Sequence, residues 1–423
     1  MPSRDVVRRF APYRACLLAV SIVAMAQAGD WPQILGPTRT GIASADEKLA
    51  ERWPAEGPRA AWRRTVGTGY AGIAVRGGRA YLFHRVEDRE VLEAIDAGSG
   101  KTLWKEGHPT TFAAQVGGGN GPLCTPVVID DVVISFGAKG VLSCHDAATG
   151  GVRWRRETHR DFGAQEGYFG AGSTPLVVDG TVIVNVGGVR EESGVVGFSL
   201  ATGATKWATT REPASYASPV AVTVEGRTCT VVVTRYQCLL IDQESGKIRW
   251  QFPFGMRGPT VNAAAPVVFR SGDGGMRLLV TAAYGIGSVC AAFDADSFRR
   301  AWEGTDSLAT QYCTPIVIDD HLYAIDGRDD VPPADFVCVE AATGRIAWRE
   351  RGFGYGTLVA ADGKLIAAKT DGEIVLVRPS PDGLRVLSRA RVLEGPLRAL
   401  PALASGRLFV RDDTTLACLE AGR

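Results

Sequence analysis

The sequence predicts an all-β protein, an eight-bladed β-propeller of four-stranded antiparallel blades closed by an N-terminal strand. Two observations predict this fold. An eleven-residue pattern recurs along the 423-residue chain, and the 51 glycines indicate many tight turns between short strands. A single four-stranded sheet cannot bury both of its faces, so such units must stack on neighbours. The period and the strand count favour a propeller over a solenoid.

The repeated pattern ends in a tryptophan. Its six full copies are AIDAGSGKTLW (94–104), CHDAATGGVRW (144–154), GFSLATGATKW (197–207), LIDQESGKIRW (240–250), AFDADSFRRAW (292–302) and CVEAATGRIAW (338–348). A seventh copy, VRPSPDGLRVL, has Leu387 in place of the tryptophan. Successive tryptophans lie 50, 53, 43, 52 and 46 residues apart, so each unit is one blade. Because the six indoles repeat at one position of the pattern, we expect them between adjacent sheets rather than around a ligand.

Each copy of the pattern describes a turn between two strands. An aspartate such as Asp146 is placed to accept hydrogen bonds from the turn backbone, and a glycine such as Gly150 supplies a positive φ. Upstream, a pair such as Thr125-Pro126 opens the first strand, where a missing N–H is tolerated. Asp-Asp and Asp-Gly turns then divide the following β-branched runs into hairpins. Each unit is therefore expected to be a four-stranded meander.

The two ends of the repeat region are complementary. The last repeat begins at Leu400-Pro401 and reaches Arg423 before any tryptophan, whereas Trp62 precedes the first complete blade. We expect the segment around Trp62 to supply the outer strand of the last blade, which removes the exposed edges of an open ring. The expected organisation is a signal peptide at 1–28, a Pro- and Gly-rich leader at 29–57 draped over the ring, and the propeller at 58–423.

The first 28 residues are typical of an export signal. Arg4, Arg8, Arg9 and Arg14 precede an apolar run, ACLLAVSIVAMA, and Ala26-Gln27-Ala28 fits a cleavage site. The run is shorter than the ~20 residues that span a bilayer. We therefore expect a periplasmic or secreted protein, cleaved after Ala28, with no membrane span in the mature chain.

Charge and cysteine content narrow the possible partners and ligands. The mature chain carries 43 basic and 45 acidic residues, and this near-neutral balance argues against nucleic acid as a partner. Its eight cysteines include pairs at equivalent repeat positions, such as Cys144 and Cys338, which favours buried thiols over disulfides. The five histidines show no metal-ligand spacing, so no metal site is expected. The protein is expected to be a monomer.

The six motif copies resemble the PQQ-like (pyrroloquinoline quinone-like) β-propeller repeat family, with its A-x-D-x-x-T-G-x-x-W-type tryptophan-docking motif. The resemblance covers residues 58–423. The stretches WPQILGPTRTG and GYFGAGSTPLVV are similar to secreted or periplasmic propellers of planctomycete-type bacteria. More distantly, the family includes the lipoprotein of outer-membrane β-barrel assembly and the quinoprotein dehydrogenases, which bind pyrroloquinoline quinone and Ca²⁺ at the ring centre. The vicinal cysteines of those dehydrogenases and the lipidation cysteine of that lipoprotein have no match here.

The candidate binding residues lie in the loops between blades. These loops gather on one face of a propeller, around the central channel, and the two longest ones, about 20 residues each, precede Pro126 and Pro175. A mixture of acid, amide, guanidinium and phenol groups suits a protein, a glycan or a small polar ligand. The candidate residues are Gln115, Asn120, Asp161, Glu166, Tyr168, Tyr216, Arg257, Asn262, Gln311 and Tyr312. For each residue the alternative is that it satisfies the loop backbone.

No catalytic constellation is recognisable in the sequence, and none of these residues is assigned a catalytic role. The sequence therefore favours a non-catalytic exported scaffold that binds a protein or ligand in the cell envelope. The alternative is an oxidoreductase that depends on pyrroloquinoline quinone and Ca²⁺, with its site at the central channel. A role in binding or processing glycans is a third hypothesis.

Overall fold

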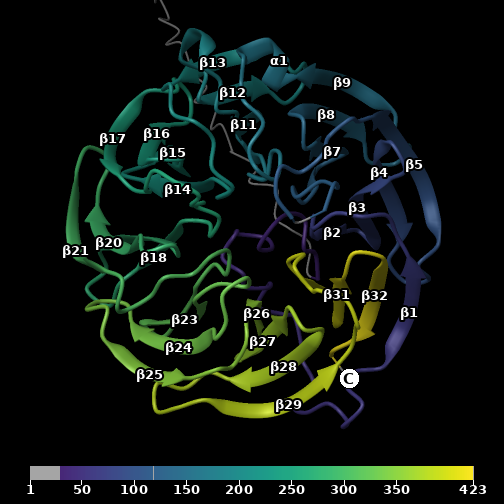
Figure 1. Cartoon of the computed structure of the whole chain (residues 1–423), viewed down its shortest axis with the longest axis vertical. Helices are drawn as coiled ribbons and strands as arrows, with labels where there is room; N and C mark the ends of the chain where they lie inside the picture. The colour runs from purple at the N-terminus through teal and green to yellow at the C-terminus, as the bar shows by residue number, and fades with distance from the viewer. Residues whose placement is uncertain (1–28, 118, 423) are drawn as a thin grey trace, which may run out of the picture.

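The computed structural model describes residues 29–117 and 119–422, and the expected signal peptide lies outside them. Eight four-stranded antiparallel sheets are arranged around a centre, with the fourth strand of each blade at the periphery (Figure 1). The eight-bladed propeller predicted from the sequence is confirmed.

The first four blades follow one another along the chain. Blade 1 contains β2 (Ile73–Arg76), β3 (Arg79–Val86), β4 (Arg89–Asp96) and β5 (Thr102–Pro109). Blade 2 contains β6 (Val127–Ile129), β7 (Val132–Phe136), β8 (Val141–Asp146) and β9 (Val152–Glu157). Blade 3 contains β10 (Leu176–Val178), β11 (Thr181–Asn185), β12 (Val195–Ser199) and β13 (Thr205–Thr209), with α1 (Thr158–Phe162) before it and the 3-10 turn η1 (Arg190–Glu192) within it. Blade 4 contains β14 (Val220–Val224), β15 (Arg227–Val233), β16 (Gln237–Asp242) and β17 (Ile248–Pro253).

The remaining blades complete the ring. Blade 5 contains β18 (Val267–Arg270), β19 (Met276–Ala282), β20 (Gly287–Phe293) and β21 (Phe298–Gly304). Blade 6 contains β22 (Ile316–Ile318), β23 (His321–Asp326), β24 (Asp335–Glu340) and β25 (Ile346–Glu350). Blade 7 contains β26 (Gly356–Ala361), β27 (Lys364–Lys369), β28 (Glu373–Arg378) and β29 (Arg385–Arg391). Blade 8 contains β30 (Ala402–Ala404), β31 (Arg407–Arg411) and β32 (Thr415–Glu420), with β1 (Ala60–Thr65) as its outer strand.

The ring is closed by pairing of the two ends of the propeller. β1 runs antiparallel to β32, and Trp62 lies opposite Cys418. The closure predicted from the orphan Trp62 is therefore confirmed. This pairing covers the edge of β32, which would otherwise be open to strands from other chains.

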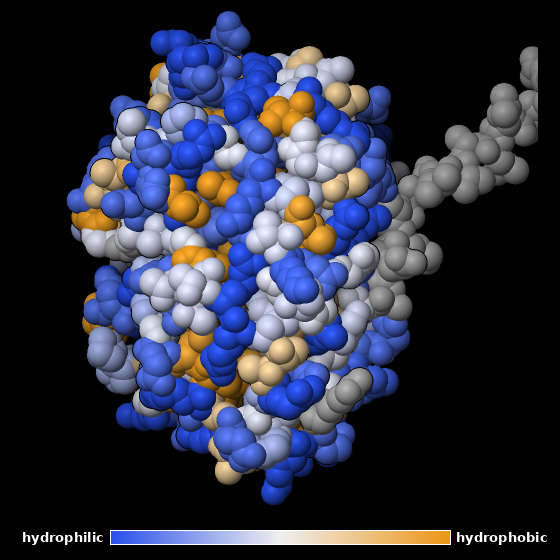
Figure 2. Space-filling view, turned by 90° about the vertical axis from the view of Figure 1, so that its right-hand side faces the viewer, coloured by the Kyte–Doolittle hydropathy of each residue, from blue (hydrophilic) through white to orange (hydrophobic). Residues whose placement is uncertain are grey.

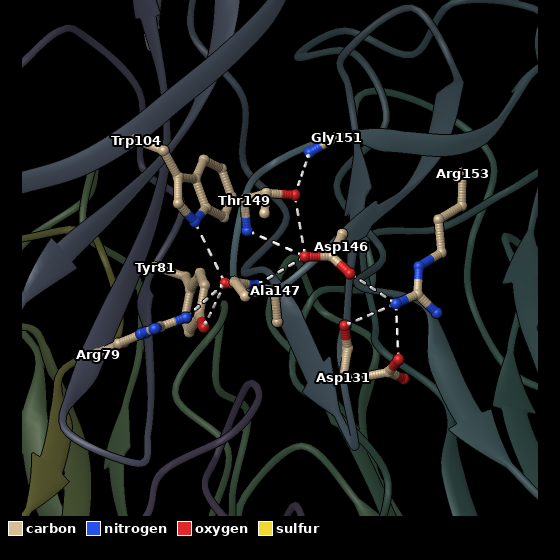
Figure 3. Close-up of polar contacts among 10 residues, drawn as sticks. Arg79, Tyr81, Trp104, Asp131, Asp146, Ala147, Thr149, Gly151 and Arg153 are labelled. Carbon is tan, nitrogen blue, oxygen red and sulfur yellow. Dashed lines mark hydrogen bonds and ion pairs between the residues drawn. The ribbon is translucent and has the colours of Figure 1, made fainter.

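Each repeat tryptophan joins its blade to the next one. Figure 3 shows this for Trp104, whose Nε1 donates a hydrogen bond to the Ala147 carbonyl, 3.2 Å away in blade 2. Arg79 and Tyr81 donate to the same carbonyl, and the Asp146 carboxylate holds the turn by accepting from the backbone N–H and hydroxyl of Thr149. The equivalent indole bonds are those of Trp62 to Ala97, Trp154 to Leu200, Trp207 to Gln243, Trp250 to Asp294, Trp302 to Ala341 and Trp348 to Ser380.

The motif glycine makes room for the indole. Gly100 has a φ of 72°, and a Cβ at this position would lie 2.7 Å from the Trp62 ring. A side chain would therefore both strain the turn and displace the indole.

The junction between blades 7 and 8 uses a different tryptophan. Leu387 takes the repeat position in blade 7, and the leader residue Trp53 packs in the same core cluster with only 3% of its surface exposed. Its Nε1 donates to the Ala421 carbonyl at 3.2 Å, and its backbone N–H donates to the Ser388 hydroxyl at 2.8 Å. Ala421 follows β32 as Ala97 follows β4. The leader thus supplies the indole that the seventh repeat lacks.

The leader begins at the centre of the ring, where Figure 1 shows it in purple. Trp31 exchanges two backbone hydrogen bonds with Val75 of blade 1, and the Pro32 carbonyl accepts from Val128 of blade 2. The segment then pairs with blade 7 through Ala360. The sequence signal for this course was limited to the Pro- and Gly-rich composition of residues 29–57.

Arg39 extends from the leader toward the opposite blades. It is 3% exposed and donates to the carbonyls of Thr174, Pro175 and Pro219, at the start of the inner strands of blades 3 and 4. Burial lowers the pKa of Arg39 to about 9, so the side chain remains charged at neutral pH. The leader therefore connects inner strands on both sides of the channel.

The side of the ring that faces the viewer in Figure 2 is mainly polar, with apolar residues in small separate groups. Leu103 on β5 is one exposed apolar residue of the outer strands, with 47% of its surface exposed. Scattered apolar residues are ordinary on a protein surface.

All eight cysteines of the described chain are free and buried, in agreement with the interpretation as packing residues. In the described residues no helix has the length and apolar composition for a membrane span.

Candidate functional site: a groove on the loop-rich face

Two kinds of loop share one face of the ring. In an antiparallel meander, the links between blades emerge on the same side as the loops between the second and third strands. Over blades 2 to 4 these loops enclose a groove of about 520 Å³. Its wall comes from the links that contain Gln115, Tyr168, Tyr216 and Asn262, and from the loops after β11 and β15.

Five of the ten residues proposed from the sequence line this groove: Gln115, Glu166, Tyr168, Tyr216 and Asn262. Gln115 and Tyr168 belong to the two long links, which are joined by a hydrogen bond from the Gln115 backbone N–H to the Tyr168 carbonyl. The Tyr216 hydroxyl accepts from the Phe169 backbone N–H at 3.0 Å. This bond joins the link between blades 3 and 4 to the link between blades 2 and 3. Tyr168 is 39% exposed and open to a ligand.

Arg257 lies at the edge of the groove. Its guanidinium carbon is 5.9 Å from the ring centre of Tyr236, a residue of the wall. On the same ring, the guanidinium carbon of Arg235 lies 5.4 Å away. Two guanidinium groups therefore lie close to the ring of Tyr236.

Asn120 and Asp161 serve local structure. The Asn120 side-chain oxygen accepts from the Ala114 backbone N–H at 3.1 Å, which closes its own loop. Asp161, on α1, forms ion pairs with Arg156 and Arg160 at 3.3 Å. Neither residue lines the groove.

Gln311 belongs to a separate network, the channel belt, which we define as Tyr70, Gln311, Asp329 and Arg398. Tyr312 follows Gln311 but donates its backbone N–H to the Tyr355 hydroxyl at 2.6 Å, and its own buried hydroxyl has no partner among the described residues. Arg398 forms an ion pair with Asp329 at 2.7 Å and donates to the Tyr70 hydroxyl at 3.3 Å. The Gln311 side-chain oxygen accepts from the backbone N–H of Asp329. The belt joins the links from blade 5 to 6, from blade 7 to 8 and from blade 8 to 1, and the loop between β23 and β24. The candidate residues are therefore spread over the groove, the belt and local loop contacts.

Two buried amides in the groove wall present unpaired acceptors. Asn185 and Asn262 are 2% and 1% exposed, and the Oδ1 atom of each has no hydrogen-bond partner among the described residues. The Nδ2 atom of Asn185 donates to the Val233 carbonyl at 3.1 Å, and that of Asn262 donates to the Thr234 carbonyl at 2.9 Å. Because a carbonyl can only accept, these bonds fix the orientation of both amides. The free atoms are oxygens, which require an N–H or O–H donor.

His159 adds a third unpaired polar atom to the wall, a donor or an acceptor according to its tautomer. Its Nδ1 atom has no partner among the described residues, and desolvation lowers its pKa to about 4. The imidazole is therefore neutral at pH 7. The nearby carboxylate of Glu166 pairs with Lys139 at 3.3 Å, so this side of the groove carries little net charge.

Sequence reasoning missed Asn185, Arg235 and Tyr236. Asn185 lies at the end of β11, and Arg235 and Tyr236 lie in the loop between β15 and β16. None of the three belongs to a link between blades, where the sequence placed the candidate residues. A usable signal was present, since Asn185 is the last residue of the apolar run TVIVN, and Arg235 and Tyr236 directly follow the run VVVT.

The described residues show no cluster of acidic side chains for the Ca²⁺ ion of the quinoprotein hypothesis. Within residues 29–117 and 119–422, no group of three or more His, Cys, Asp or Glu side chains is placed to hold a metal ion. Protein Ca²⁺ sites combine carboxylate oxygens with backbone and amide carbonyl oxygens and water, so this finding concerns the carboxylate part of such a site. In the channel belt, the carboxylate of Asp329 pairs with Arg398.

Comparison with known proteins places this chain. Residues 87–350 match the family model described as "Outer membrane protein assembly factor BamB". The chain belongs to this family. The PQQ-like repeat family expected from the motifs is thereby confirmed. A comparison with curated protein sequences gave no match.

Solved structures share the fold at low sequence identity. BamB from Moraxella catarrhalis is 18% identical with a TM-score of 0.61, over 85% of this chain and 99% of that one. The quinohemoprotein alcohol dehydrogenase from Comamonas testosteroni is 14% identical with a TM-score of 0.67, over 93% and 81%. A europium-containing methanol dehydrogenase is 12% identical with a TM-score of 0.67, over 90% and 89%. These structures support the propeller and do not distinguish a scaffold from a dehydrogenase.

Proposed function

We propose that this protein is an exported, non-catalytic propeller that binds a protein partner in the cell envelope through the groove over blades 2 to 4. The unpaired acceptors of Asn185 and Asn262 support this proposal most directly. Leaving a buried acceptor unpaired costs about 1–3 kcal/mol. Both oxygens are closed off from solvent in the unbound groove, so a bound segment recovers this energy where the wall opens to admit its N–H or O–H donor.

The composition of the same face favours a protein partner. Protein interfaces are enriched in Tyr, Met and Arg, and exposed apolar residues often mark them. Of the large apolar side chains that are exposed in the described chain, five lie in loops of this face: Val116, Tyr168, Val189, Met256 and Val331. Arg235 and Tyr236 line the groove.

Export is supported by residues 1–28 and by the family. The basic segment, apolar run and Ala26-Gln27-Ala28 site remain a prediction from the sequence. The family description names an outer membrane protein assembly factor, in agreement with a protein of the cell envelope. We propose that the mature chain begins at Gly29 and acts there.

Site-specific photo-cross-linking in native envelopes tests the proposal. A photoreactive residue replaces Val189, which lines the groove and is 59% exposed, or Leu103, a matched control that is 47% exposed on outer strand β5. We expect one defined protein adduct from position 189 and none of the same mass from position 103. The purified adduct partner should then bind the unlabelled protein.

Two results would contradict the proposal. One is an identical adduct pattern from both positions, since the groove would then have no special role. The other is dye-linked alcohol oxidation, together with a large thermal shift, after addition of pyrroloquinoline quinone and Ca²⁺. That result would make the protein a quinoprotein.

A further inference from the structure

We propose that the segment bound by the groove is acidic, and that Arg235 and Arg257 bind its carboxylates beside the acceptor of Asn262. This inference rests on the proposed function and specifies the chemistry of the partner. The observation behind it is the pair of guanidinium groups on Tyr236, neither of which pairs with a carboxylate in the described part of the chain.

Arg235 is held in place but not neutralised. Its Nη1 donates to the Thr260 hydroxyl at 2.9 Å and its Nη2 donates to the Gly258 carbonyl at 2.7 Å. A guanidinium has five N–H groups, so donors remain for a ligand. Both protein partners are neutral, and the positive charge therefore stays available at a half-buried position in the groove wall.

Arg257 adds a second cation at the edge. The side chain is exposed, and its guanidinium carbon lies 5.9 Å from the ring centre of Tyr236. A guanidinium near an aromatic ring keeps its N–H edge free for a carboxylate. Arginine recognises carboxylates well because two parallel N–H groups match the two oxygens.

Of the nearby acids, Glu212 is hydrogen-bonded to the loop of Tyr236 and Glu166 is ion-paired. The Glu212 carboxylate accepts from the Tyr236 backbone N–H at 3.2 Å and from the Thr234 hydroxyl at 3.1 Å. Glu166 pairs with Lys139 on the opposite side of the groove. The donors to Glu212 are neutral, so this carboxylate keeps its negative charge, and the two guanidinium groups still leave a net positive charge at the Tyr236 side.

The acceptor of Asn262 lies next to this charge. The Asn262 amide donates to the carbonyls of Thr234 and Arg235, so its free oxygen is fixed to the same loop that carries the guanidinium of Arg235. Where the wall opens to expose this buried oxygen, a matching ligand presents an anion and an N–H donor side by side. An extended peptide with Asp or Glu does so, because its backbone N–H groups alternate with the acidic side chains.

Fluorescence anisotropy with the complete mature protein tests this inference. The probes are a labelled 12-residue peptide with four Asp or Glu residues, and the same peptide with Asn or Gln at those positions. We expect the acidic peptide to bind at least tenfold more tightly and to weaken as salt rises from 50 to 500 mM. Arg257→Gln and Arg235→Lys should each lower the affinity about five- to tenfold.

Arg299→Gln is the matched control, because Arg299 is exposed on outer strand β21. Equal binding of the two peptides, or equal effects of Arg257→Gln and Arg299→Gln, would overturn the inference. A neutral hexasaccharide that displaces the acidic peptide, and that binds the parent and the Arg257→Gln variant equally well, would likewise overturn the inference. That result would indicate a glycan ligand. If position 189 still gives its specific adduct, only the acidic preference fails; if it gives none, the proposed function fails.

Discussion

Replacement of Trp53 by alanine tests how the leader completes the ring. Trp53 is 3% exposed between blades 7 and 8, where the repeat position is occupied by Leu387. The indole contacts the blade 8 core and donates to the Ala421 carbonyl. Trp53→Ala removes both the packing and the hydrogen bond.

The magnitude follows from the buried surface. An indole buries about 150–250 Å², which corresponds to roughly 4–6 kcal/mol at 25 cal/mol per Å² as an upper estimate. Measured Trp→Ala substitutions cost about 3–5 kcal/mol, so we expect a loss of about 4 kcal/mol. With an unfolding entropy of about 2.1 cal/mol/K per residue, a chain of 423 residues should melt about 4–5 °C lower.

Thermal unfolding followed by circular dichroism measures this shift. Trp348→Ala is a suitable comparison, because Trp348 is the repeat tryptophan of blade 6 and donates to Ser380. We expect the two variants to lose similar stability. A Trp53→Ala protein that melts within 1 °C of the parent would refute the claim that the leader is part of the fold.

Further outcomes follow from other buried groups. Arg39→Met should lower the free energy of unfolding by about 3 kcal/mol in urea titrations, because it leaves carbonyls of blades 3 and 4 without donors; an unchanged midpoint would contradict this role. Burial lowers the pKa of His145 to about 4, below its unfolded value of about 6.5. The neutral imidazole therefore contributes fully to the free energy of unfolding above pH 6.5, and up to about 3 kcal/mol of that contribution is lost as the pH falls to 4. His145→Gln should flatten this part of the stability curve, and an unaltered curve would exclude the assignment. The eight buried thiols should not react with an aromatic disulfide reagent in the native protein and should all react in guanidinium; rapid native labelling would show that a cysteine is accessible.

The fold was predictable because its signal is local and repeated. Each Asp–Gly turn and each tryptophan can be recognised in isolation, and six copies in register leave little freedom for the topology. Closure was predictable for the same reason, since Trp62 and the unfinished last repeat are complementary. The eighth indole was not, because Trp53 lies outside the pattern and reaches Ala421 only through the three-dimensional path of the leader.

The candidate site was predictable only in part. Gln115, Glu166 and Tyr168 were found because long links between blades usually carry binding residues. Tyr216 and Asn262, in shorter links, were found because all the links gather on one face of the ring. Sequence alone does not show whether a loop side chain points into the groove or back to its own backbone, as Asn120 does. Nor does it show that Asn185 and Asn262 bond through Nδ2 and leave Oδ1 free, because the partner carbonyls belong to another blade or another loop.

Hydrogen exchange measured by mass spectrometry, with and without the cross-linked partner bound, tests the groove most directly. The account predicts slower exchange in segments 158–175, 186–194, 210–219, 234–236 and 254–266, with unchanged exchange in the outer strands. Protection confined to the outer strands, or to the opposite face of the ring, would contradict it.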